Sequence, residues 1–256
     1  MSTVLSLPSN SSMNLYPENR ISHYRVQFPK VLEFKDTDYE VGLAAFTYPR
    51  TWFNFSPAEN YEITYFLADT EGKISALLPG HYDNVAIVLR ELRMTRGVYQ
   101  SFIDFEYAEV MEKIIFKFDT QLADQILRIK LSPNLARKLG WAHQEVEIAG
   151  SGGTIVFSPG VIRIDELDAI YVNCDLARDD HVVGHVMQPL LQTVCVKGSH
   201  GDMMTYEPQN ISWLPLRKSF YTSTEVMICD GQGRLVPFER GTCIVQVHIR
   251  RRSIFT

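Results

Sequence analysis

Hydrophobic and polar residues alternate with a period of two along much of the chain. This period places successive side chains on opposite faces of a strand, so each alternating run predicts a β-strand with one buried face. The predicted strands are residues 20–28, 39–48, 61–67, 113–118, 125–131, 167–174, 224–229 and 243–250. At least eight strands at short spacing predict an all-β fold, either a sandwich or a barrel.

Turn residues separate these runs. Residues 230–233 (DGQG) and 69–72 (DTEG) combine Asp with Gly, and both residue types tolerate the positive φ that a tight hairpin turn requires. Residues 150–153 (GSGG) predict a flexible loop tip. These turn residues therefore agree with a succession of antiparallel strands.

Two short helices interrupt the pattern. Asp83 can cap the first, which we expect near residues 83–95 because its apolar residues recur at spacings of three and four. The second is expected at residues 132–140, with Ser132 as its cap, Pro133 at its first position and Gly140 at its end.

The chain shows no feature that divides it into separate domains. It has no Pro- or Ser-rich linker, no internal repeat and no low-complexity tract. Residues 8–19 are rich in Ser, Asn and Pro, and we expect residues 1–19 to form an N-terminal arm that becomes ordered only on a neighbouring subunit. Residues 20–256 are then expected to be one domain with helical insertions.

Composition narrows the class of protein. The net charge of −5 argues against nucleic-acid binding, although residues 250–252 are locally basic. The first residues do not resemble a secretory signal, and we expect no membrane insertion because no apolar run reaches about 20 residues. The four cysteines are far apart and sit mostly in apolar runs, which predicts buried free thiols rather than disulfides or a zinc site.

Each candidate catalytic motif in the sequence favours a structural explanation. His181 and His185 have the spacing of a zinc-binding helix, but Val182 stands where the general base of such hydrolases would be. His200 and Asp202 could belong to a catalytic triad, but no nucleophile elbow accompanies them. No phosphate-binding loop or dinucleotide fingerprint occurs. We therefore predict no catalytic residue, no cofactor and no bound metal, and the protein is not expected to be an enzyme.

The order and spacing of several short motifs carry a family resemblance. They are residues 7–13 (LPSNSSM), 16–19 (YPEN), 39–43 (YEVGL), 52–54 (WFN), 78–82 (LPGHY), 139–141 (LGW), 170–175 (IYVNCD), 188–191 (QPLL), 236–241 (VPFERG) and 247–251 (VHIRR). In this order the chain resembles the penton, or minor capsid protein, of Polinton (Maverick) elements and the related adintoviruses, from residue 5 to residue 251.

This resemblance implies a single jelly-roll β-sandwich and a structural role in a virion. A penton forms homopentamers at the fivefold vertices of an icosahedral capsid, beside a major capsid protein of the double jelly-roll type. The protein would then be made in the cytoplasm or nucleus of the host cell. The alternative that the residues leave open is a non-pentameric minor virion protein or a receptor- or glycan-binding β-sandwich. The interaction residues expected are Asn10, Ser11, Ser12, Arg250, Arg251 and Arg252.

Overall fold

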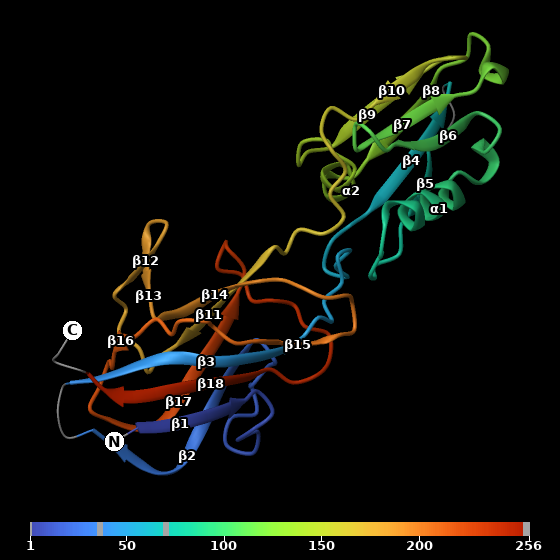
Figure 1. Cartoon of the computed structure of the whole chain (residues 1–256). Helices are drawn as coiled ribbons and strands as arrows, with labels where there is room; N and C mark the ends of the chain where they lie inside the picture. The colour runs from blue at the N-terminus through green and yellow to red at the C-terminus, as the bar shows by residue number, and fades with distance from the viewer. Residues whose placement is uncertain (1, 35–37, 69–71, 253–256) are drawn as a thin grey trace. The chain divides into compact units, whose positions relative to one another are not determined.

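The computed structural model describes residues 2–34, 38–68 and 72–252. The chain forms two compact units (Figure 1). Unit 1 comprises the residues up to Trp52 and from Leu167 onward, and unit 2 comprises Phe53–Glu166. Unit 2 is therefore an insertion in the sequence of unit 1. Of the expected turn at residues 69–72, the first three residues lie outside the described part of the chain.

Unit 1 contains two four-stranded layers of antiparallel strands. The first layer has the order β1 (Ser2–Pro8), β18 (Ile244–Arg251), β3 (Tyr39–Pro49) and β15 (Met203–Tyr206), and the short β16 (Leu214–Pro215) also pairs with β3. The second has the order β14 (Leu190–Cys195), β11 (Ala169–Cys174), β17 (Phe220–Cys229) and β2 (His23–Glu33). A separate hairpin, β12 (His181–Val183) and β13 (Val186–Gln188), connects β11 to β14.

The order of these strands is that of a jelly roll. Numbered along the chain without β16 and the β12–β13 hairpin, the eight long strands of unit 1 fall in the order 1-8-3-6 in one sheet and 5-4-7-2 in the other. This is two interlocked Greek keys, the arrangement that defines the double-sheet jelly roll. The predicted all-β jelly-roll sandwich is thus confirmed, and unit 2 is inserted between its third and fourth strands.

Alternation of apolar residues builds the core of unit 1. In β18 the residues Val245, Val247 and Ile249 are buried, while the residues between them face outward. The same period of two brings Val41 and Leu43 of β3 into this core. Between the layers, the buried Tyr24 hydroxyl donates to the carbonyl oxygen of Leu7 at 2.9 Å, which joins the edge strands β1 and β2. The side chains on the outer face of each sheet can be polar or can contribute to interfaces.

Unit 2 is a second, smaller β-structure with its own core. One sheet has the order β5 (Lys73–Ala76), β4 (Glu62–Leu67), β8 (Leu127–Leu131) and β9 (Val146–Gly150). The other has the order β10 (Ile155–Phe157), β7 (Lys113–Phe118) and β6 (Ile103–Ala108). Helices α1 (Val85–Thr95) and α2 (Pro133–Lys138) both belong to this unit, together with the 3₁₀ turns Gly97–Tyr99 and Thr120–Leu122.

Both predicted helices are present, with one change in capping. Asn84, rather than Asp83, caps α1, because its side-chain oxygen accepts the amide of Ile87 at 3.1 Å. Pro133 is the first residue of α2, as expected, but the Ser132 hydroxyl donates to the carbonyl oxygen of Asn60 instead of capping the helix. Gly140 follows the helix with a φ of 93°, a conformation that favours glycine at this stop.

The domain organisation differs from the expected arm over residues 1–19 and single domain over residues 20–256. Residues 2–8 are an edge strand of the jelly roll, and Leu7 is buried in its core. The β1–β18 pairing continues through Ser9, whose amide donates to the Cys243 carbonyl at 2.8 Å. The apolar residues of this strand alternate with polar ones, a pattern that the overall composition of the segment does not show. The two units are distinguished by their hydrophobic cores, which are separate.

Candidate interaction surfaces

The N-terminal turn, residues 9–19, folds against the free edge of β2. The Asn19 amide group makes two hydrogen bonds to the backbone of Arg25, accepting its N–H at 2.8 Å and donating to its carbonyl at 2.9 Å. The Ser12 hydroxyl accepts the amide of Gln27 at 2.9 Å. An edge strand has N–H and C=O groups that no neighbouring strand pairs with. Here the side chains of Asn19 and Ser12 form hydrogen bonds with such groups of β2.

Three of the residues expected to contact a neighbour belong to this turn. The Ser11 hydroxyl donates to the Pro8 carbonyl at 2.8 Å, and Ser12 has a φ of 55° in addition to its contact with β2. Both side chains therefore serve the fold of their own chain. Asn10 is exposed at the tip of the turn. Exposed apolar side chains, which the sequence did not single out, follow at Met13 and Leu15.

The other expected interaction residues end β18. Arg250 lies over the indole of Trp213, with the guanidinium carbon 3.7 Å from the ring centroid, and its Nε donates to Glu40 at 2.6 Å. Arg252 is exposed, and its backbone amide donates to the carbonyl of Asp38 at 2.6 Å. Arg251 is exposed, and it lies opposite Tyr39 in the pairing of β18 with β3. The side chain of Arg250 is therefore engaged in a contact within unit 1.

The histidine motifs lie in turns and a hairpin. His181 starts β12, and His185 lies in the tight turn that follows Gly184, so the pair is not on a helix. Asp202 accepts the amide of Ser199 at 2.7 Å, which closes the turn around His200. Among the described residues, no three His, Cys, Asp or Glu side chains are grouped as metal ligands.

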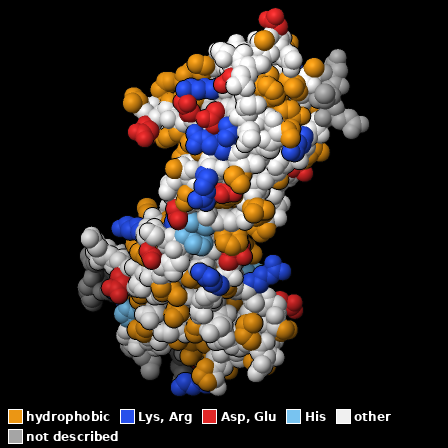
Figure 2. Space-filling view, turned by 90° about the vertical axis from the view of Figure 1, so that its right-hand side faces the viewer, with side chains coloured by type: hydrophobic (Ala, Val, Ile, Leu, Met, Phe, Trp, Pro, Cys, Tyr) orange, Lys and Arg blue, Asp and Glu red, His pale blue; other side chains and the backbone are white. Residues whose placement is uncertain are grey.

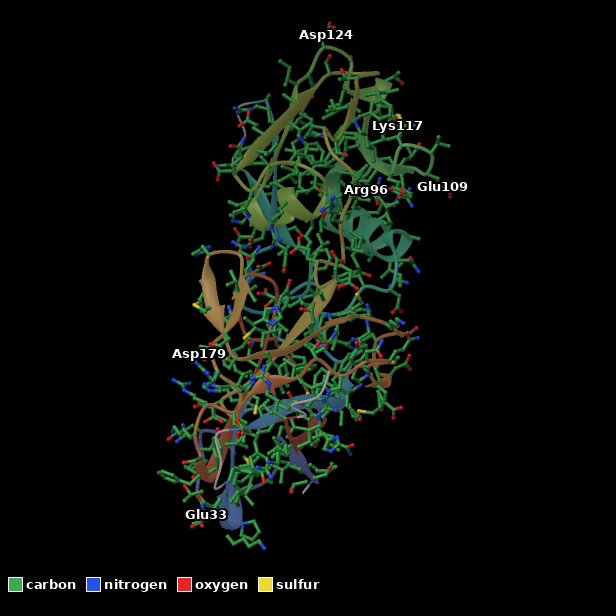
Figure 3. The ribbon with its side chains drawn as sticks, turned by 60° about the vertical axis from the view of Figure 1, so that its left-hand side comes forward. Glu33, Arg96, Glu109, Lys117, Asp124 and Asp179 are labelled. Atoms are coloured by element: carbon green, nitrogen blue, oxygen red, sulfur yellow. The ribbon has the colours of Figure 1, made fainter. Side chains whose placement is uncertain are left out.

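The β12–β13 hairpin carries exposed apolar side chains. It stands apart from the two sheets of unit 1, and Figure 3 places Asp179 at its foot. Asp179 pairs with Arg217 at 3.4 Å. Val182 and Met187 occupy opposite positions in the hairpin and are both exposed. On the face drawn in Figure 2, hydrophobic side chains lie among charged ones.

A groove lies along the flank of unit 1 where β14 and β15 form the edges of their sheets. It has a volume of about 550 Å³. Tyr48 and Val194 lie at its base, and Met204 and Tyr206 of β15 contribute to its wall. The Gln192 side chain bridges the two sheets here by donating to the Tyr206 hydroxyl at 3.2 Å. The flank is thus hollowed, with both polar and apolar side chains along the groove.

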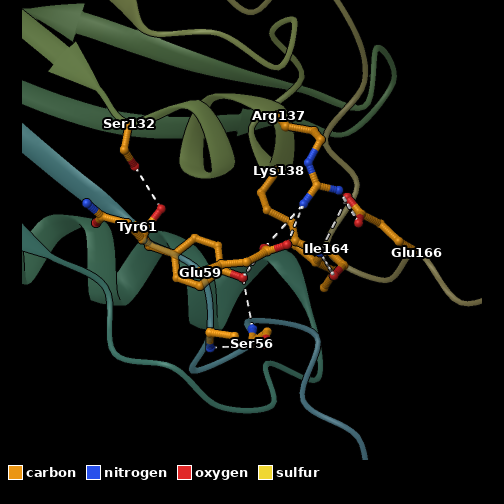
Figure 4. A network of polar contacts seen from close by, with 10 residues as sticks. Ser56, Glu59, Tyr61, Ser132, Arg137, Lys138, Ile164 and Glu166 are labelled. Carbon is orange, nitrogen blue, oxygen red and sulfur yellow. Dashed lines mark hydrogen bonds and ion pairs between the residues drawn. The ribbon is translucent and has the colours of Figure 1, made fainter. Parts of the chain in front are cut away.

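A charged network in unit 2 connects its first and last segments (Figure 4). Arg137 of α2 binds two carboxylates at once, Glu59 at 3.3 Å and Glu166 by a short contact. Tyr61 donates to Glu59 at 2.7 Å and accepts the amide of Ser56 at 2.9 Å. Residues 56–61 lead into unit 2 and residue 166 leaves it, so α2 ties both segments together.

Lys138 is the buried cation of this network. Its ammonium group donates to the carbonyl of Ile164 at 3.2 Å, lies 3.4 Å from Glu166 and stands over the ring of Phe55. Burial lowers the pKa of Lys138, and the charge of Glu166 opposes that change. A lysine with a lowered pKa can act as a nucleophile, but this side chain is 3% exposed and its nitrogen is fully engaged. Its role in this site is structural.

The cysteines divide into one exposed and three buried thiols. Cys174, Cys229 and Cys243 are buried and Cys195 is exposed, and all four are free. Burial raises the pKa of Cys174 to about 12 and that of Cys229 to about 11. The prediction of buried free thiols therefore holds for three cysteines, where burial disfavours the reactive thiolate, and is wrong about the burial of Cys195.

In the described part of the chain, no helix combines the length and hydropathy needed to cross a bilayer. No protein-family model and no curated protein sequence matches this chain.

The fold has a counterpart among solved structures. The crystal structure of the mavirus penton protein matches 98% of this chain and 100% of that chain, with 10% sequence identity and a TM-score of 0.53. A chain of the Sputnik virophage, solved by cryo-EM, matches 99% of this chain over 98% of its own length, with 11% identity and a TM-score of 0.47. The resemblance to a penton is therefore confirmed as a resemblance of fold: this chain folds like the mavirus penton protein along almost its entire length.

Proposed function

We propose that this protein is a penton, a structural virion protein that forms homopentamers at the fivefold vertices of an icosahedral capsid. The observation that carries the proposal is the extent of the structural match, which covers 98% of this chain and all of the mavirus penton protein. A match limited to the jelly roll would fit many virion proteins, because jelly rolls occur widely in capsids. This match also spans the insertion between β3 and β11.

The architecture of unit 1 suits a ring. Cyclic assembly joins two different surfaces of each subunit, so it needs two separate flanks that complement each other. The jelly roll has such flanks, because β1 and β2 end the sheets on one side and β14 and β15 end them on the other. The partners proposed are four further copies of the chain and a major capsid protein of the double jelly-roll type. No catalytic role is proposed.

The oligomeric mass tests the proposal. The purified chain should form particles of five times its 29.3 kDa mass, alone or with the major capsid protein. Each subunit carries a net charge of −5, so rings should be more stable as added salt screens the repulsion. A chain that stays monomeric at high concentration and high salt, and is missing from the vertices of imaged capsids, would refute the penton.

A second candidate function is binding by unit 2 to a receptor or glycan. The observation that favours it is the edge strand β10, where Ile155 and Phe157 are 54% and 44% exposed on the same face. Exposed apolar residues at a sheet edge are typical of binding surfaces. Substituting Phe157 by Asp should then reduce attachment of the assembled protein to host cells without changing its oligomeric mass. Unchanged attachment would remove the support for this function.

A further inference from the structure

We propose that the N-terminal turn of one copy docks into the groove between β14 and β15 of the next copy, with Leu15 as the central side chain. This inference rests on the proposed function, because it assigns the two surfaces that meet in the ring. The occupant of the groove is a second copy of the same chain.

The N-terminal turn presents a preformed apolar projection. Leu15 is 63% exposed and Met13 is 42% exposed. The backbone beneath them is fixed, since the amides of Leu15 and Tyr16 both donate to the carbonyl of Ser12, at 3.0 and 2.9 Å. The Asn19 contacts with Arg25 hold the end of the turn on β2. A projection ordered before binding loses little conformational entropy when it docks.

The groove offers a complementary surface. Its volume of about 550 Å³ accommodates a few side chains, and the partly buried Met204, Tyr206 and Pro208 line it beside polar residues. Apolar contacts surrounded by polar groups are common in sites that receive an apolar anchor. The exposed Cys195 also lines the groove, which places a natural chemical reporter there.

The two surfaces lie on opposite flanks of unit 1. The turn joins β1 to β2 at one edge of both sheets, and the groove follows β14 and β15 at the other edge. A contact between opposite flanks is heterologous, so each copy uses its turn on one neighbour and its groove on the other. Repetition of such a contact closes a ring of five when each copy is rotated by a fifth of a turn from the last, whereas a contact between two identical flanks ends at a dimer.

Each surface carries one acidic and one basic side chain. Glu18 and Arg20 flank the projection, and Lys197 and Glu207 line the groove. Within the described ranges, none of these four side chains takes part in an ion pair. A contact that places Glu18 near Lys197 and Arg20 near Glu207 pairs all four between copies, and such complementarity fixes the register of an interface.

Cross-linking to the native thiol tests the contact. The variant Leu15→Cys, assembled and treated with a short bismaleimide, should give a ladder of covalent species up to the pentamer on a reducing gel. The ladder should be absent from the unmodified chain and from Leu15→Cys combined with Cys195→Ser. Val110→Cys is the matched control, because Val110 is fully exposed in unit 2 and should not produce the ladder.

Charge reversal provides an independent measurement. Glu18→Lys and Lys197→Glu should each raise the concentration at which rings dissociate by about tenfold, and the double variant should restore it, since a rescued pair shows direct coupling. Rings of normal mass without the Leu15→Cys ladder would overturn this contact and leave the penton intact. A native chain that forms no rings would overturn both. Rings that show the ladder and the charge rescue would establish the contact.

Discussion

The guanidinium carbon of Arg250 lies 3.7 Å from the centroid of the Trp213 ring, and the arginine Nε donates to Glu40 at 2.6 Å. Trp213 belongs to the segment before β16, which passes over β3 closely enough that a side chain at Gly42 would meet Ile211 and Ser212. Arg250 therefore fastens this segment to the outer face of the sheet.

Removing that arginine should destabilise unit 1. We expect Arg250→Ala to lower the free energy of unfolding by about 1–2 kcal/mol, because it removes a cation–π contact and leaves the carboxylate of Glu40 without its ion pair. Urea denaturation measures the change. Arg252→Ala is the control and should stay within about 0.5 kcal/mol of the native chain. Equal effects at the two positions would contradict the assigned role.

Asn19 should protect the edge of β2. Replacing it by Ala removes both hydrogen bonds to the backbone of Arg25, so we expect a loss of about 1–2 kcal/mol. Exchange of the Arg25 amide hydrogen should become faster, since its acceptor is gone. The Arg25→Ala variant separates this effect from the side chain of Arg25, which binds Glu225. Unchanged exchange of the residue-25 amide in Asn19→Ala would rule out the protection.

Replacing Arg137 by lysine should destabilise unit 2. It contacts Glu59 and Glu166 from one planar guanidinium, and a lysine offers a single ammonium group that cannot bind both in the same way. We expect Arg137→Lys and Arg137→Ala to lose similar stability, about 1–3 kcal/mol in urea. Arg90→Ala, at an exposed pair with Glu91, should have little effect. A lysine variant as stable as the native chain would show that the double contact with Glu59 and Glu166 does not stabilise the unit.

Stability should fall in alkaline solution. Burial raises the pKa of Cys174 to about 12, whereas a thiol in the unfolded chain ionises near about 8.5. Above that pH the unfolded chain releases protons that the folded chain retains, so the free energy of unfolding decreases. Cys229, with a pKa raised by burial to about 11, acts in the same direction. Lys138 opposes them, because its lowered pKa makes the folded chain release a proton first.

Urea titrations at pH 8 and pH 10, under reducing conditions, measure this dependence. Each buried thiol contributes a slope of about 1.4 kcal/mol per pH unit between its two pKa values. Cys174→Ala should be less stable at pH 8 but should show a shallower decline. A native chain as stable at pH 10 as at pH 8 would contradict the prediction.

Thiol reactivity should follow burial. One cysteine, Cys195, should react rapidly in the native protein, and all four should react after unfolding without a reductant. The Cys195→Ser variant should abolish the rapid reaction. Fewer than four thiols in the unfolded chain would reveal a disulfide, and rapid reaction of a second thiol would show that one of the buried sites opens.

The sequence by itself determined the strands and helices that local patterns encode. Alternation fixed which side of β8 and β18 is buried, and Pro133 and Gly140 marked the limits of α2. The order of the short motifs further indicated a penton-like jelly roll. These features depend on residues close in sequence, where periodicity and backbone preference act directly.

Only the tertiary structure decided which distant residues meet. The pairing of β1 with β18 turned an expected arm into an edge strand, and Arg250 was assigned to Trp213 rather than to a neighbour. The division at Trp52 and Leu167 follows from two separate cores, which share one pattern of alternation along the chain. Such contacts are set by packing between segments far apart in sequence, and local propensity contains no information about that choice.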